Sequence, residues 1–197
     1  MDKIFQIGDF TFQLCCPDEI TPPPNFMLFE RGDTESVSGG GDAGEAEKPQ
    51  YTYRMHVASE LPEPEGKVIA SRPDLVVFEN ERGESRLIGV KGTEGYYACY
   101  QEIGPDCAEI TFAGNRIGGL HIDPVFSSLL ALERRLVKRD NIILHCAYVE
   151  YHGEAILFSA PSETGKTTQA NLWEKYRGSR TVNGDRSLLG KKNGRWT

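Results

Sequence analysis

The stretch Ile156-Leu157-Phe158-Ser159-Ala160-Pro161-Ser162-Glu163-Thr164-Gly165-Lys166-Thr167-Thr168 decides how this chain is interpreted. It begins with an apolar run typical of a strand and continues through small and polar residues. A segment with helical character follows, up to about Tyr176. Ala160 to Thr167 match a P-loop, whose pattern is Gly or Ala, four variable residues, and then Gly-Lys-Thr or Gly-Lys-Ser. Its position between a strand and a helix is the context that this motif requires.

The residue types explain the chemistry that this pattern predicts. Consecutive backbone N–H groups that end at a helix N-terminus form a nest for phosphate, and Gly165 allows the backbone to approach it without a Cβ. Lys166 would reach the β- and γ-phosphate oxygens, and the Thr167 hydroxyl would bind Mg²⁺. The predicted ligand is ATP or another nucleoside triphosphate, and a plain turn with helix nucleation by Ser162 or Thr164 is the alternative. The predicted nucleotide-binding residues are Ala160, Pro161, Ser162, Glu163, Thr164, Gly165, Lys166, Thr167 and Thr168.

Downstream of the loop, a predicted strand near Arg180–Asn183 is followed directly by Asp185. A carboxylate at the carboxyl end of such a strand would face the same crevice as the loop. Asp185 is therefore a predicted metal ligand, with Thr167, and a predicted catalytic residue, while a simple turn is the other interpretation. Arg186 could pair with phosphate or with a neighbouring acid, and the sequence does not decide between them.

Upstream of the loop, His145 lies in an otherwise apolar predicted strand, Ile142–Tyr151, which ends in a turn at His152-Gly153. A lone histidine in a strand is more often a core residue than a catalyst. From the residues alone, His145 is therefore a weaker site residue than Asp185.

The first part of the chain reads as short strands separated by turns, and residues 1–115 are predicted to form an antiparallel β-rich domain. The segment 31–50 is rich in Gly, Ser, Asp and Glu, which predicts a mobile loop. A helix is expected from Asp123-Pro124 onward, and residues 116–197 are predicted to form the nucleotide-binding domain. The predicted strands are a hairpin over Ile4–Leu14 and the segments Tyr51–Val57, Lys67–Ala70, Leu75–Phe78, Arg86–Val90, Tyr96–Tyr100 and Ala108–Phe112.

Composition excludes several classes of protein. The net charge is −7 over 197 residues, and the basic residues are scattered, which argues against nucleic acid as a partner. The chain has no apolar run long enough to span a membrane and no secretory signal at Met1, so no membrane partner is expected. Its five cysteines lack C-x-x-C spacing, which indicates neither a disulfide framework nor a zinc site and fits a cytoplasmic protein.

With these residues placed, Ile142 to Leu189 resemble the HPr kinase/phosphorylase family, which has a phosphoenolpyruvate-carboxykinase-like P-loop fold. That family has a His-containing strand, a turn, a second strand, a P-loop, a helix, and a strand ending in paired aspartates. The resemblance implies an α/β P-loop fold in the C-terminal part, cut short, with the β-rich domain before it. It also strengthens His145 as a catalytic residue flanking the phosphates. Four stretches are similar to uncharacterised bacterial members: Leu144–Ala147, Ile156–Ser159, Gln169–Trp173 and Asn183–Arg186.

The departures from the family pattern shape the functional expectation. Glu163 stands where the family has glycine, and Gly184 replaces the first of the paired aspartates, so Asp185 would act alone. The resemblance implies an ATP- and magnesium-dependent kinase that acts on a protein, a peptide or a small hydroxyl acceptor. A nucleotide-binding accessory module that recruits a peptide or partner without transferring phosphate is the alternative. We also expect a fragment of a longer protein, whose open sheet edge near Arg195-Trp196 would favour homo-oligomers.

Overall fold

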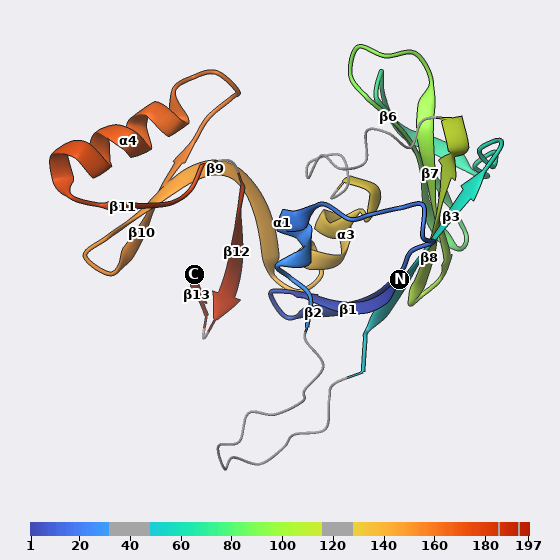
Figure 1. Cartoon of the computed structure of the whole chain (residues 1–197), viewed down its shortest axis with the longest axis horizontal. Helices are drawn as coiled ribbons and strands as arrows, with labels where there is room; N and C mark the ends of the chain where they lie inside the picture. The colour runs from blue at the N-terminus through green and yellow to red at the C-terminus, as the bar shows by residue number, and fades with distance from the viewer. Residues whose placement is uncertain (32–47, 116–127, 185, 193) are drawn as a thin grey trace. The chain divides into compact units, whose positions relative to one another are not determined.

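The computed structural model describes residues 1–31, 48–115, 128–184, 186–192 and 194–197 (Figure 1). The chain divides into two compact units, Met1–Leu132 and Glu133–Thr197. The boundary predicted between residues 115 and 116 adjoins 116–127, which lie outside the described residues, as do most of the predicted mobile loop 31–50 and the predicted helix start at Asp123. No described helix is long and apolar enough to cross a membrane.

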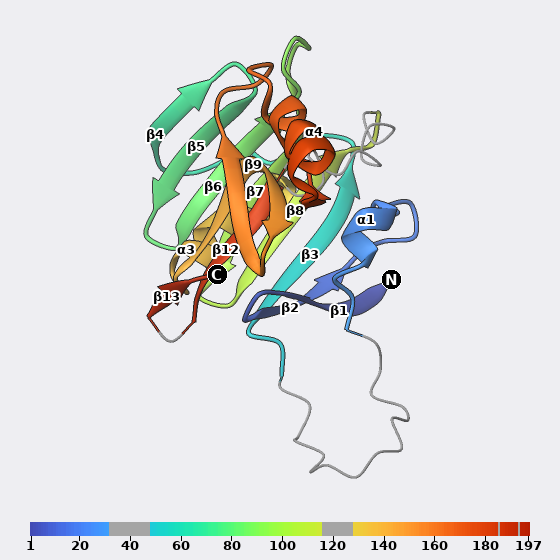
Figure 2. The ribbon, with the colours of Figure 1, turned by 90° about the vertical axis from the view of Figure 1, so that its left-hand side faces the viewer.

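The first unit is built on an eight-stranded sheet with the order β1-β2-β3-β8-β7-β6-β5-β4, whose strands from β4 to β8 are seen side by side in Figure 2. All the strands predicted in this part of the chain are confirmed. The antiparallel prediction is wrong at β3, which runs parallel to both β2 and β8. The strands are β1 (Asp2–Ile7), β2 (Phe10–Cys15), β3 (Tyr51–Ala58), β4 (Lys67–Arg72), β5 (Leu75–Asn80), β6 (Gly83–Gly89), β7 (Tyr96–Gly104) and β8 (Cys107–Ala113), and the short helix α1 is Pro24–Met27.

Aromatic side chains form the core beneath β1, β2 and β3. Phe12 is fully buried, and its ring centroid lies 5.7 Å from that of Phe5, 5.2 Å from Phe10 and 5.3 Å from Tyr53. Phe26 of α1 packs against the same cluster, 4.9 Å from Phe5. Alternation along β2 and β3 brings these rings to one face of the sheet, because successive side chains of a strand point to opposite faces.

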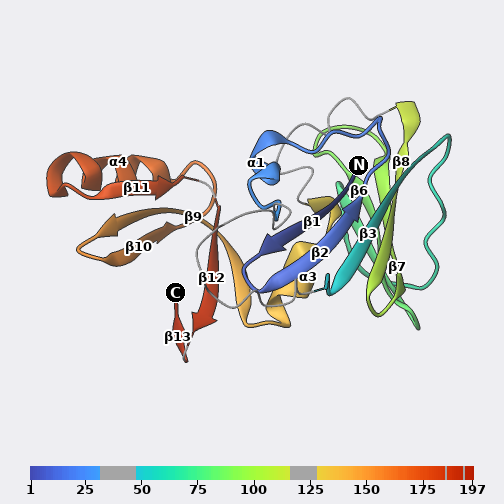
Figure 3. The same ribbon diagram turned by 60° about the horizontal axis from the view of Figure 1, so that its bottom comes forward.

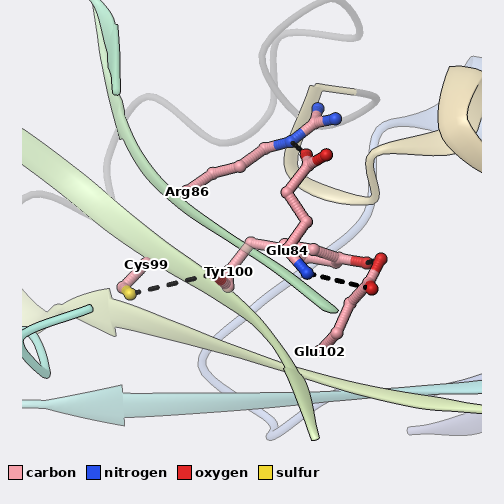
Figure 4. A network of polar contacts seen from close by, with 5 residues as sticks. All are labelled: Glu84, Arg86, Cys99, Tyr100 and Glu102. Carbon is pink, nitrogen blue, oxygen red and sulfur yellow. Dashed lines mark hydrogen bonds and ion pairs between the residues drawn. The ribbon is translucent and has the colours of Figure 1, made fainter. Parts of the chain in front are cut away.

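A buried polar network links β6 and β7 (Figure 4). The Glu84 carboxylate accepts a hydrogen bond from Arg86 Nε. Glu102 accepts one from the Glu84 backbone N–H, at 3.0 Å, and one from the Tyr100 hydroxyl, at 3.2 Å. Burying these carboxylates requires such donors, because an unpaired buried charge is strongly destabilising.

Gly83, the first residue of β6, lies directly against the Glu102 side chain of this network. Its φ is +135°, and a Cβ added there would lie 1.9 Å from Glu102 Oε2. We expect Gly83→Ala to lower the free energy of unfolding by about 2 kcal/mol, because it combines backbone strain with displacement of the Glu102 carboxylate. Gly92→Ala is the matched control: its φ is +87° but no atom lies within 4 Å, so it should cost only about 1 kcal/mol. Equal losses in urea denaturation would show that the network does not constrain Gly83.

The second unit is a five-stranded antiparallel sheet built around the long strand β9 (Asn141–Tyr151). One edge of β9 pairs with β10 (Glu154–Ser159), and the other edge pairs with β11 (Arg180–Asn183) and β12 (Arg186–Lys192). The His152-Gly153 turn between β9 and β10 is confirmed, with φ of +52° and +79°. The remaining elements are α3 (Leu132–Val137), α4 (Lys166–Arg177) and β13 (Arg195–Trp196), which pairs with β12.

One helix, α4, packs against this sheet, over β9, β10 and β11 (Figures 1 and 3). Ala147 and Val149 of β9 and Ala170 of α4 are fully buried between the two layers, and three partly buried side chains surround them: Ile156, Phe158 and Trp173. The odd-numbered residues of β9 therefore face α4. The β12–β13 hairpin turns away from α4 (Figures 1 and 3).

The predicted fold class, an α/β P-loop fold preceded by a β-rich domain, is wrong. The described residues form thirteen strands and three helices in two sheets, and every pairing in the second sheet is antiparallel. The physical reason lies in β9, which runs between β10 and β11 and pairs with both. Along the sequence, β10, the loop, α4 and β11 follow one another in the order that a P-loop fold also has. This order does not reveal that β9 lies between β10 and β11 in the sheet.

Candidate functional site

The predicted phosphate loop joins the end of β10 to the start of α4, and its backbone contains two left-handed residues. Glu163 has a φ of +65°, and Gly165, the residue before the first turn of α4, has a φ of +94°. Turns of this kind direct successive N–H groups into one concavity. Glu163 stands where the resembling family has glycine, and its backbone has a conformation that glycine adopts most easily. Its side chain is exposed.

The side chain of Lys166 bonds to the backbone of this loop. Its half-buried ammonium group donates to the carbonyl oxygen of Ala160 at 3.0 Å and to that of Pro161 at 3.1 Å. The Thr164 hydroxyl donates to the same Pro161 oxygen at 2.7 Å. These contacts hold a positive charge above the loop at the N-terminus of a twelve-residue helix, where the helix dipole also favours anions.

The hydroxyl residues of the loop are accessible. Ser162, Thr167 and Thr168 are exposed, and no side chain among the described residues caps the N-terminus of α4. Within the described part of the chain, the N–H groups of the first helical turn therefore have no side-chain cap, and an incoming anion could accept hydrogen bonds from them. Thr167 lies beside Lys166 in that turn, the position in which its hydroxyl could reach a cation bound to phosphate.

Strand register brings His145 close to the loop. Ser159, the last residue of β10, pairs with Cys146, and its hydroxyl donates to the carbonyl oxygen of His145 at 3.3 Å. His145 is exposed. Like Ala147 and Val149, it is an odd-numbered residue of β9, so it lies on the face of the strand against which α4 packs. It is therefore a surface residue beside the loop, and not the core residue that strand histidines more often are.

Asp185 itself lies outside the described residues, but the residues on either side of it do not. Arg186 pairs directly with His145 across β9 and β12, and its backbone N–H donates to Asn183 Oδ1 at 3.2 Å. Residues directly opposite one another in a sheet share a face, so Arg186 and His145 lie on the same side as α4. The sequence left open whether Arg186 pairs with phosphate or with a neighbouring acid. Its place opposite His145 follows from the pairing of β9 with β12, which the sequence pattern does not reveal.

Four of the five cysteines are poorly suited to act as nucleophiles. Burial raises the pKa of the Cys16 and Cys99 thiols to about 12, and burial also raises the pKa of Cys15 and Cys107. Thiolate is the reactive form, so these side chains are poor nucleophiles near neutral pH. Among the described residues, no group of three or more His, Cys, Asp or Glu side chains could hold a metal ion.

Comparisons with protein-family models, curated proteins and solved structures give no match. The resemblance to the HPr kinase/phosphorylase family therefore stays a prediction.

Proposed function

We propose that the loop Ala160–Thr167 binds the phosphates of a nucleoside triphosphate, ATP or another, together with Mg²⁺. One observation carries the proposal: the ammonium group of Lys166 is held over the loop by the Ala160 and Pro161 carbonyl oxygens, at the start of α4. An anion in the loop would take over this ammonium group and gain the N–H groups of the first turn. The left-handed Gly165 supports the same interpretation, because it keeps a Cβ away from the anion.

The reaction that we propose is transfer of the γ-phosphoryl group to a hydroxyl of a protein, a peptide or a small molecule in the cytoplasm. The acceptor oxygen forms a new bond to phosphorus while the bond from phosphorus to the leaving diphosphate oxygen breaks. The acceptor proton would pass to the Asp185 carboxylate or the His145 imidazole. The pairing of His145 with Arg186 supports this assignment, because it brings His145 into register with the strand that follows Asp185.

Magnesium would neutralise charge on the phosphate oxygens. Mg²⁺ usually takes one or two protein ligands and keeps water and phosphate oxygens for the rest, so a site without a large acidic cluster is compatible with it. The exposed Thr167 hydroxyl in the first turn of α4 fits this requirement. Thr167 and Asp185 are the residues that would hold the ion.

Glu163 favours a second candidate, a nucleotide-binding accessory module that does not transfer phosphate. Its exposed carboxylate lies within the loop and would repel the triphosphate. Incubation with γ-labelled ATP and hydroxyl-containing peptides separates the candidates: label in the peptide supports the kinase, and bound but unreacted ATP supports the module. Absence of both binding and transfer would contradict the two together.

Asp185→Asn tests the metal part of the proposal. The change keeps the size of the side chain and removes its charge, so the Mg²⁺-dependent part of ATP affinity should fall by roughly tenfold. Affinity for ATP without metal should stay the same or rise, because a carboxylate near the phosphates is lost. Isothermal titration at several Mg²⁺ concentrations measures both, and an unchanged Mg²⁺ dependence would make Asp185 a turn residue only.

A further inference from the structure

The face of the second sheet opposite α4 contains a hollow of about 670 Å³. We call it the β10–β13 hollow. Alternation explains its lining: Ile156 and Phe158 face α4, so Ala155 and Leu157 face the other side of β10. The lining includes the apolar or aromatic side chains of Tyr148, Leu157, Leu189 and Trp196 and two charged side chains, Glu154 and Arg195. The hollow is therefore largely apolar, and it lies across the sheet from the helix that begins at the phosphate loop.

The charge beside this hollow differs from that of the protein as a whole. The hairpin segment 190–196 contains Lys191, Lys192 and Arg195 and no acidic residue, in a chain of net charge −7. Lys191 and Arg195 are exposed. Neither has an ion-pair partner within the described part of the chain. Positive charge next to an apolar surface is complementary to a partner that combines carboxylates with apolar side chains.

Strand β10 offers a backbone edge along the same hollow. It is the terminal strand in the order β10-β9-β12-β13, and no described strand pairs with its outer side. Extended peptides bind such edges through main-chain hydrogen bonds, and pockets beside the edge accept alternate side chains. Three residues of β10 line the hollow: Glu154, Ala155 and Leu157.

We propose that the β10–β13 hollow binds an extended peptide segment of a partner protein, which pairs with the outer edge of β10. Apolar side chains at alternate positions enter the hollow, and carboxylates on the same side of the peptide pair with Lys191 and Arg195. The site does not use Lys166 or any residue of the phosphate loop, so it does not depend on the proposed nucleotide binding.

Two fluorescein-labelled octapeptides of opposite sequence order test the proposal by fluorescence anisotropy. Each carries two leucines and two aspartates at alternate positions, with threonine between them. We expect saturable binding to the full chain in at least one orientation. The same peptide with alternate amides N-methylated should bind at least roughly tenfold more weakly, because strand pairing is blocked. Lys166→Ala should leave peptide binding unchanged, which keeps this test separate from that of nucleotide binding.

Variants of the chain locate the site. Trp196→Ala should weaken peptide binding by roughly tenfold or more. Tyr176→Ala is the matched control, since this aromatic side chain is 69% exposed, against 53% for Trp196, but lies on α4. Arg195→Glu should weaken binding of the aspartate peptides and favour peptides with lysine in their place. Thermal unfolding verifies that the variants are folded.

Three results would overturn the proposal. The first is no binding of either peptide, or binding that Trp196→Ala and N-methylation leave unchanged. The second is a concentration-dependent dimer in sedimentation that Trp196→Ala dissolves, because the occupant would then be a second copy of the chain. The third is tighter binding of a single-stranded oligonucleotide that Arg195→Glu abolishes.

Discussion

Lys166→Ala is expected to remove the stabilisation that Mg²⁺ and ATP give to this protein. At a nucleotide concentration about 100 times the Kd, a ligand that binds only the folded state stabilises it by about 2.7 kcal/mol. Lys166 supplies the one ammonium group that the described loop holds over its own carbonyl oxygens, so the variant loses the charge that meets the phosphates. Denaturation with and without nucleotide measures the difference directly.

Lys175→Ala is the control for Lys166→Ala. Lys175 belongs to the same helix, but its ammonium group lies 5.1 Å from the Tyr176 ring centroid and away from the loop. The Lys175→Ala variant should therefore be stabilised by Mg²⁺ and ATP as much as the wild type. Without nucleotide, Lys166→Ala should cost only about 1–2 kcal/mol, the value of two ordinary hydrogen bonds. Equal nucleotide stabilisation of wild type and Lys166→Ala would rule out the phosphate site.

The second large effect is expected in the first unit, at Phe12. Replacing this fully buried ring with alanine removes contacts with three neighbouring rings and leaves a cavity, which typically costs about 3–5 kcal/mol. That is a large part of the stability of an ordinary domain. Urea denaturation followed by tyrosine fluorescence and far-ultraviolet circular dichroism measures the loss.

Phe29→Ala provides the comparison for Phe12→Ala. Phe29 is 46% exposed and touches the aromatic cluster only at its margin, 6.4 Å from the Phe26 ring centroid. Its loss should cost about 1 kcal/mol or less. If both variants lose the same stability, the cluster is not the core of this unit.

Much of the local structure could be predicted from the sequence, because turns and strand alternation are local properties. The Gly8-Asp9 turn correctly predicted the β1–β2 hairpin, and Arg180–Asn183 was predicted as a strand with its observed bounds. Strand pairing could not be predicted in the same way. Nothing in the apolar pattern of β3 distinguishes parallel from antiparallel neighbours, and nothing in β9 indicates that one of its edges serves two strands.

The same distinction between local sequence and strand pairing applies to the candidate site. The loop around Lys166 was found from its motif, because the geometry of a phosphate nest depends on a few consecutive residues. The position of Arg186 opposite His145 could not be predicted from a motif, because it follows from the register of β12 on β9. The β10–β13 hollow was also missed, because it requires the β12–β13 hairpin to turn away from α4. The conformation of Glu163 was unexpected for a residue with a side chain.

The position of β3 has a consequence for how fast this protein reaches its native state. Tyr51 pairs with Phe12, and Thr52 pairs with Cys107, so both edges of β3 are completed by segments that are remote along the chain. Closing such long loops costs entropy before any contact is gained, and topologies dominated by remote pairing fold in milliseconds to seconds. The hairpins β1–β2 and β7–β8 can form early, but the aromatic core closes only when β3 inserts between them. Refolding after dilution from urea should therefore be slow, with β3 as the last strand to be protected from hydrogen exchange.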